Sequence, residues 1–177
     1  SGELAATNGG RLVLSSAVVD GGGHGIILAD GAGSEVVVSD STIQGTTLAT
    51  ANDGIVRLDT ATLDGRNEAV IIDGDVVIAG GDTATIVGRI TNAGQIVLEG
   101  PGATLAVGVG SDETATLRGF GVVELTASTS ISAATAGSPD ARLINVNNAI
   151  VATGGTIGDD DGASIDVAVT NRAAGLI

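Results

Sequence analysis

The chain has 177 residues, the size of one domain, and its 43% apolar and 16% charged residues exclude an ordinary disordered protein. Twenty-one acidic residues against seven arginines give a net charge of −14, which argues against binding to nucleic acid or anionic membrane surfaces. There is no cysteine, so the core must stabilise the fold without disulfides. No apolar run approaches the ~18 residues of a membrane-spanning helix, and we expect no membrane insertion.

Short apolar runs follow one another along the chain, without the i, i+3, i+4 spacing of a helix. These runs are 12–14, 25–28, 36–38, 69–72, 76–78 and 95–98. Asp-Gly or Asn-Gly pairs, which favour tight turns, occur at 8–9, 20–21, 30–31, 53–54, 64–65, 73–74 and 161–162. The pattern predicts many short strands with a corner every few residues and no significant helix.

One segment recurs along the chain, at 14–21, 38–45, 58–65 and 82–88. The last two copies share the order Asp-Thr-Ala-Thr followed by an aliphatic residue, at 59–63 and 82–86. The aliphatic anchors of these copies and of three looser echoes lie about 22 residues apart on average. They are Val19, Ile43, Leu63, Ile86, Leu105, Ile131 and Ile150.

A period near 22 residues with three short strands per repeat is typical of a solenoid, in which each coil buries its apolar face against its neighbours. We therefore predict an all-β fold, a right-handed parallel β-helix of about eight coils. An antiparallel sandwich also uses short strands, but it does not explain the recurring register. Residues 1–177 form a single domain in this prediction, with regular coils over 1–88 and longer loops over 89–177.

Several segments resemble the repeats of large secreted bacterial β-helix proteins. They are 9–14, 33–38, 88–105, 117–125, 143–158 and 169–177. They look like filamentous haemagglutinin-type adhesins and autotransporter passenger domains. The resemblance implies a parallel β-helix at or outside the cell surface that acts as an adhesin stalk or surface fibre and meets a cell-surface or matrix partner. The chain would then be a segment of a larger protein or a subunit that associates end to end.

His24 is the only histidine, and a catalytic role would need a carboxylate partner such as Asp20 or Asp30. A plain corner residue is the favoured interpretation. The run 22–27 resembles a calcium-binding nonapeptide but has Ile27 at the aspartate position, and no phosphate-loop Lys follows it. The sequence therefore predicts no catalytic residue and no cofactor-binding residue here.

Two acidic turns, 159–161 and Asp73 with Asp75, offer oxygen ligands. We expect solvated turns, with weak calcium binding at 159–161 as the alternative. Paired carboxylates could also serve a glycosidase or polysaccharide lyase. Sugar sites need lining groups in a pocket, and this chain has one aromatic residue and scattered arginines, so we predict no enzyme.

Three further groups of residues carry structural expectations. Thr60, Thr62, Thr83 and Thr85 recur in register, which makes a threonine-lined surface-binding module an alternative function. Asparagines near predicted corners are expected to form amide ladders between coils. They are Asn92, Asn145, Asn147, Asn148 and Asn171. Phe120 is expected to fill the core or plug an end. The leading hypothesis is a non-enzymatic structural segment of an extracellular β-helix protein.

Overall fold

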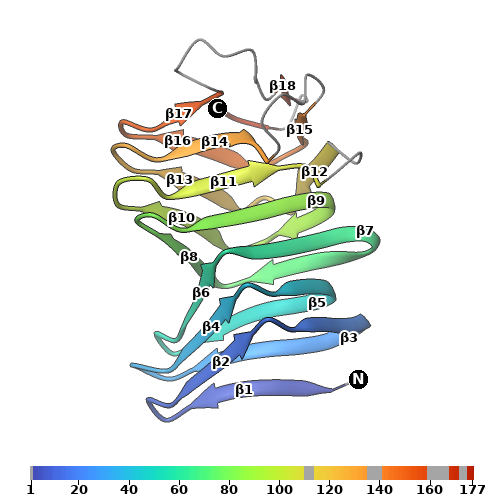
Figure 1. Ribbon diagram of the computed structural model, residues 1–177, viewed down its shortest axis with the longest axis vertical. Coiled ribbons are helices and arrows are strands. Elements are labelled where there is room, and N and C mark those ends of the chain that lie inside the picture. Colours follow the sequence, from blue (N-terminus) through green and yellow to red (C-terminus); the bar gives the residue numbers. More distant parts are fainter. Residues whose placement is uncertain (1, 110–113, 135–140, 159–167, 172–174) are drawn as a thin grey trace.

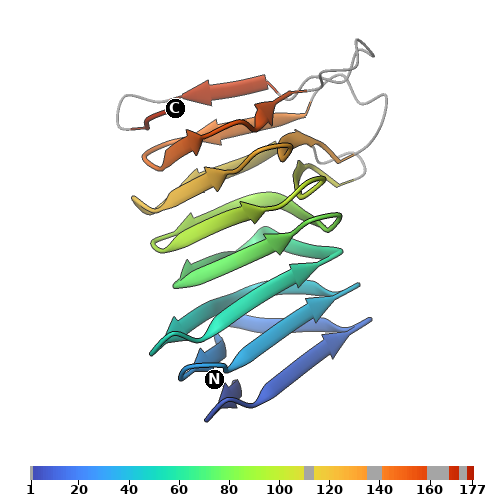
Figure 2. The same ribbon diagram turned by 90° about the vertical axis from the view of Figure 1, so that its left-hand side faces the viewer.

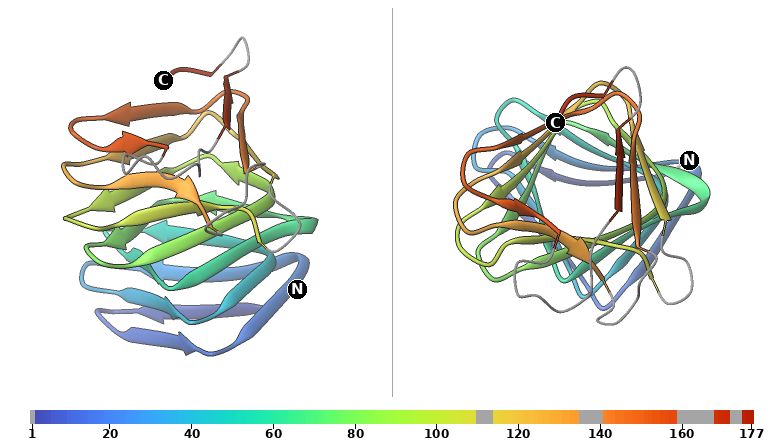
Figure 3. Two further views of the ribbon diagram at one scale, coloured as in Figure 1. Left: turned by 45° about the horizontal axis from the view of Figure 1, so that its top comes forward. Right: turned by 90° about the horizontal axis from the view of Figure 1, so that it is seen from above.

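The computed structural model is a stack of flat coils whose regular elements are strands (Figures 1 and 2). The structure describes residues 2–109, 114–134, 141–158, 168–171 and 175–177. Within these ranges every element is a strand and every strand pair is parallel, so the predicted all-β solenoid is confirmed. Viewed from above in Figure 3, the chain winds counter-clockwise as it rises toward the viewer, in a right-handed sense.

One side of the stack, which we call face 1, is a seven-stranded sheet. Its strands, from the N-terminal end upward, are β2 (Arg11–Ser15), β4 (Glu35–Ser39), β6 (Ile55–Asp59), β8 (Asp75–Ala79), β10 (Gln95–Glu99), β13 (Val122–Leu125) and β16 (Ala149–Ala152). Each strand pairs with the next one in this order, so every rung of face 1 comes from a different coil.

The remaining strands form an eleven-stranded sheet that bends around a corner. They are β1 (Glu3–Thr7), β3 (Val18–Asp30), β5 (Thr42–Ala51), β7 (Ala61–Asp73), β9 (Thr83–Asn92), β11 (Thr104–Val107), β12 (Thr114–Arg118), β14 (Ser130–Ala133), β15 (Arg142–Asn145), β17 (Thr156–Ile157) and β18 (Ala168–Asn171).

The long strands β3, β5, β7 and β9 each contribute to two sides of the stack, because each one turns the corner within its length. Their first halves continue into β11, β14 and β17, and we call this side face 2. Their second halves stack on β1 and continue into β12, β15 and β18, which we call face 3. Each coil therefore runs through three faces around one core.

The coils differ in length. One inward row of face 1 runs from Leu12 to Ile96, and its successive paired residues are 24, 20, 20 and 20 positions apart in the sequence. The next two are each 27 positions apart. The coils therefore lengthen after β10. The seven strands of face 1 span about six turns, slightly fewer than the eight coils expected.

The core consists of aliphatic rows in which each coil adds one side chain. On face 2, Ile43, Leu63 and Ile86 stack directly, and each is at most 1% exposed. On face 3, Ile27, Leu48 and Ile72 do the same. β-Branched side chains favour strands and pack well on a pleated surface, which agrees with the many buried valines and isoleucines of these rows.

The average spacing places two of the anchor residues wrongly. Leu105 stacks on Ala84, and the partner of Ile86 is Val107. Ile150 lies on face 1 above Val123, rather than above Ile131. Ile150 is misplaced because the coils lengthen to 27 residues, so a fixed spacing reaches an inward residue of another face. Leu105 lies on the same face as Ile86 but in the inward row two positions earlier, since alternate residues of one strand face inward.

The corner between faces 1 and 2 is a stack of single residues in the left-handed conformation. Ser16, Asp40 and Thr60 have φ of 51°, 47° and 51° in three successive coils. Thr60 therefore stands at the corner rather than on a strand. The pairs at 20–21 and 64–65, which the sequence predicts as tight turns, lie instead within the bent strands β3 and β7.

Glycines permit close approach of the coils at the corner that leads into face 1. A Cβ on Gly94 would lie within 3.0 Å of the carbonyl oxygen of Gly74 in the coil below. Three asparagines line the same corner: Asn92, Asn145 and Asn148 are at most 1% exposed. The amide Nδ2 of Asn92 donates to Oδ1 of Asn148 at 3.1 Å, two coils away, so the expected asparagine ladder is present.

The asparagine ladder continues upward and shapes the loop beside it. Asn145 Nδ2 donates to Asn171 Oδ1 at 3.0 Å, and Asn147 Oδ1 accepts the backbone N–H of Gly119 at 2.9 Å. The next residue, Phe120, lies neither in the core nor at an end of the stack, so that expectation is wrong. It has a φ of 64° and is 79% exposed, because the glycines on both sides place it at the tip of the corner.

Candidate functional site

The N-terminal end of the stack leaves strand edges unpaired among the described residues. β1 pairs only with β3 and β2 pairs only with β4, so their outer N–H and C=O groups face solvent. Leu4 continues the inward row of Ile27, Leu48 and Ile72, yet it is 41% exposed because no strand of the described residues pairs with β1 on its other side. Unpaired edges of this kind are templates for another strand.

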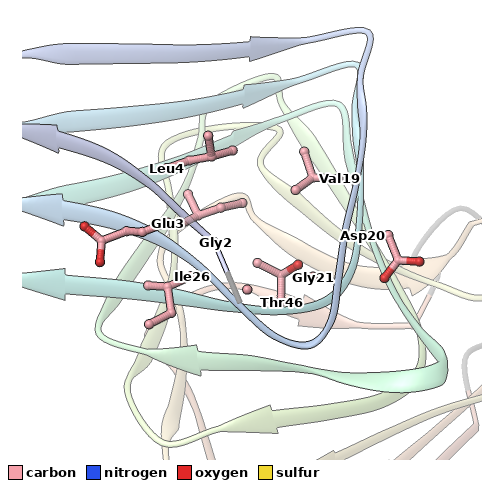
Figure 4. Close-up of a pocket in the computed structure, with 10 residues that line it drawn as sticks. Gly2, Glu3, Leu4, Val19, Asp20, Gly21, Ile26 and Thr46 are labelled. Carbon is pink, nitrogen blue, oxygen red and sulfur yellow. The ribbon is translucent and has the colours of Figure 1, made fainter.

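A hollow of about 350 Å³ opens at this end of the stack (Figure 4). Apolar side chains from β1 and β3 line it, among them Leu4, Val19 and Ile26. The carboxylate of Asp20 also borders it but points away from the hollow in Figure 4. Its shape is that of an interrupted core, and we call this region the open end.

The structure does not join His24 to a carboxylate. His24 is exposed on β3, and within the described residues no hydrogen bond links it to either predicted partner. Asp20 Oδ1 accepts the backbone N–H of Gly22 at 2.9 Å, and Asp30 Oδ1 accepts the amide of Asn52 at 2.8 Å. Asp20 thus bonds to the backbone of its own turn, and Asp30 bonds to the corresponding turn of the adjacent coil.

One carboxylate pair lies beside the corner between faces 1 and 2. Burial raises the pKa of the Asp82 carboxyl above its ordinary value, and the neighbouring Asp59 carboxylate raises it further. Ser39 Oγ donates to Asp59 at 3.0 Å. A raised folded-state pKa means that the Asp82 carboxyl favours the folded chain most below its unfolded pKa, and this contribution is lost as the pH rises.

Two other carboxylates are held in their charged form. Hydrogen bonds from Arg11 and Arg57, both at 2.7 Å, lower the pKa of Glu35 on face 1. Arg66 binds Asp64 at 2.7 Å and lowers its pKa in the same way. The Glu35 ion pairs join three successive coils, whereas the Asp64 ion pair lies within one coil. Each pair is partly exposed to solvent.

The described ranges contain no group of three or more His, Asp or Glu side chains suited to a metal ion. Asp73 and Asp75 flank Gly74 at the corner between β7 and β8. The calcium hypothesis at 159–161 concerns residues outside the described ranges. Among the described residues there is also no helix long and apolar enough to span a membrane.

Face 2 carries two outward rows of hydroxyl side chains. In the first row Thr42, Thr62 and Thr85 stack in register. The second row lies two positions away along the strands and consists of Thr83, Thr104, Ser130 and Thr156. The predicted pairing of Thr62 with Thr85 is confirmed, whereas Thr60 is excluded from the rows by its corner conformation.

The open end could not be predicted from the sequence. Leu4 is the same type of residue as the buried leucines of the core, and only the stacked structure shows that it is exposed. A scan against protein-family models and searches of curated proteins and solved structures found no match. A function for this chain must therefore be inferred from its fold and the geometry of its surfaces.

Proposed function

We propose that this chain is a structural segment of an extracellular β-solenoid protein, whose role is to provide a stiff rod that lengthens by end-to-end stacking. The open end is the observation that supports this proposal. Its unpaired edges on β1 and β2 and its exposed Leu4 would be satisfied by one more coil, supplied by a second copy or by flanking coils of the same protein.

Several features support a structural rather than a catalytic role. Four aliphatic side chains line the hollow at the open end together with three glycines, and such a lining suits packing. The Asp59 and Asp82 carboxylates lie beside an outer corner and do not line this hollow. A net charge of −14 keeps such a rod dispersed outside a cell.

Light scattering and negative-stain microscopy of the purified chain test this proposal. We expect rods one coil wide whose length increases with protein concentration. Leu4→Lys places a charge in the inward row at the open end, and it should return the chain to monomers near 17.0 kDa.

Phe120→Lys is the matched control, since it charges an even more accessible apolar residue away from both ends. It should leave the rods intact. Compact monomers of the unmodified chain at high concentration, or rods that persist in Leu4→Lys, would show that the open end does not mediate stacking.

The hydroxyl rows of face 2 favour a second candidate function, binding to an ice surface. Threonines stacked about 4.8 Å apart present hydroxyl and methyl groups in a regular array. If this is the function, the chain slows ice recrystallisation and Thr62→Lys abolishes the effect by disturbing the array. Thr116→Lys, a similar change on face 3, should have no effect, and an inactive parent chain would remove this candidate.

A further inference from the structure

The outer surface of face 1 has a central outward row contributed by one residue per strand. From β2 to β16 the row consists of Val13, Val37, Arg57, Val77, Val97, Glu124 and Val151. The row is aliphatic except for one arginine and one glutamate. An apolar row on the solvent side of a sheet is unusual for a chain of such high charge and marks a surface suited to a partner.

The valines of this row differ in exposure between its ends and its interior. Val37 and Val77, on either side of Arg57, are only 7% and 9% exposed. Val151 near the C-terminal end of the row is 43% exposed. The two ends of the row thus project, since Val13 is 46% exposed, whereas Val37 and Val77 in its interior are closely packed.

We propose that face 1 packs against face 1 of a second copy, with the two solenoid axes antiparallel. The two-fold axis runs along the strands between β8 and β10. This places β8 opposite β10 of the second copy, β6 opposite β13, and β4 opposite β16. The occupant is a second copy because the row is complementary to itself in this one register.

Charge complementarity is the strongest support for this register. Arg57 lies opposite Glu124 of the second copy, and the symmetry repeats this pair once more. Arg57 uses Nε to bind Glu35 within its own chain, and Glu124 uses Oε2 to accept from Gln95 at 3.0 Å. Opposite charges that face each other across an interface fix its register.

Apolar residues match in the same register. Val77 lies opposite Val97 of the second copy, and the closely packed Val37 lies opposite the projecting Val151. In the neighbouring outward row, which begins at Arg11, Ile55 lies opposite Val122. No pair of like charges is brought together.

Other arrangements are less favourable. A shift by one strand in either direction places Arg57 and Glu124 against valines. Parallel solenoid axes, with each strand opposite its own copy, place Arg57 against Arg57 and Glu124 against Glu124. Like charges held together at an interface are strongly unfavourable.

The contact is modest in area. Six strands spaced about 4.8 Å apart and about 16 Å long cover roughly 460 Å² of flat surface on each copy. Stable interfaces bury about 800 Å² per partner, so we expect a weak and concentration-dependent dimer.

Sedimentation equilibrium tests the dimer in a Leu4→Lys background, in which end-to-end stacking is blocked. This keeps the two proposals separate, because a dimer of the blocked chain does not depend on the open end. We expect a reversible dimer of twice 17.0 kDa. Arg57→Glu and Glu124→Arg, made singly, should each weaken dimerisation roughly tenfold or more, since each creates two like-charge contacts.

The combined Arg57→Glu and Glu124→Arg chain restores opposite charges and should recover the dimer. Arg11→Glu is the matched control, because it removes the other arm of the Glu35 ion pair but lies on β2, outside the six paired strands. The control should dimerise normally. A monomeric parent chain, unaffected single variants, or a folded double variant that fails to recover would each overturn the proposal.

Discussion

Leu63→Ala is expected to lower the free energy of unfolding by about 2–5 kcal/mol, the usual cost of truncating a fully buried leucine. Leu63 is 1% exposed and stands between Ile43 and Ile86 in the face 2 row. Both neighbours belong to rigid strands of other coils, so the structure can collapse only partly around the cavity.

Urea unfolding followed by circular dichroism measures this effect. Leu4→Ala is the matched control, because it removes the same atoms from a leucine that is 41% exposed, and it should cost much less. Equal losses for the two variants would contradict the stacked core and would mean that position along the row does not determine burial.

Gly94→Ala is expected to destabilise the chain by about 1–3 kcal/mol or more through overpacking. A Cβ at this position would lie within 3.0 Å of both the carbonyl oxygen and the amide nitrogen of Gly74. These are backbone atoms of the adjacent coil, and they cannot move aside without lengthening the hydrogen bond from Gln95 N–H to the Gly74 carbonyl.

The same unfolding experiment applies, with Gly2→Ala as the control. A Cβ on Gly2 meets no atom within 4 Å, so that variant should match the parent chain within about 0.5 kcal/mol. If Gly94→Ala proved as stable as Gly2→Ala, the coils could not approach as closely at this corner as the structure indicates.

Much of the fold could be predicted because local residue types repeat at a recognisable spacing. The two Asp-Thr-Ala-Thr segments lead into β7 and β9 with Gly65 opposite Gly88, as their similarity implies. The prediction lost accuracy after residue 100. Coils of 27 residues replaced shorter ones there, and the inward aliphatic residues of the three faces do not differ in kind.

Phe120 and the open end illustrate what residue types alone do not convey. An aromatic residue is usually buried, but two flanking glycines and a left-handed φ place Phe120 at a corner tip. Likewise, the row from Val13 to Val151 appears only after residues 20–27 positions apart are paired. Both the open end and this row therefore depend on how the coils are stacked in register, which the residue types alone do not give.

The spacing between paired strands also bears on how such a chain acquires its shape. Every described strand pair joins residues on successive coils, so a new coil needs only a short loop to close, however long the whole protein is. The entropic barrier is then divided into small steps of one coil each, and a finished coil serves as the template for the next. A chain of this kind can fold by nucleation and propagation, adding one coil at a time. Its folding time then grows with the number of coils rather than with the sequence distance between the two ends of the chain.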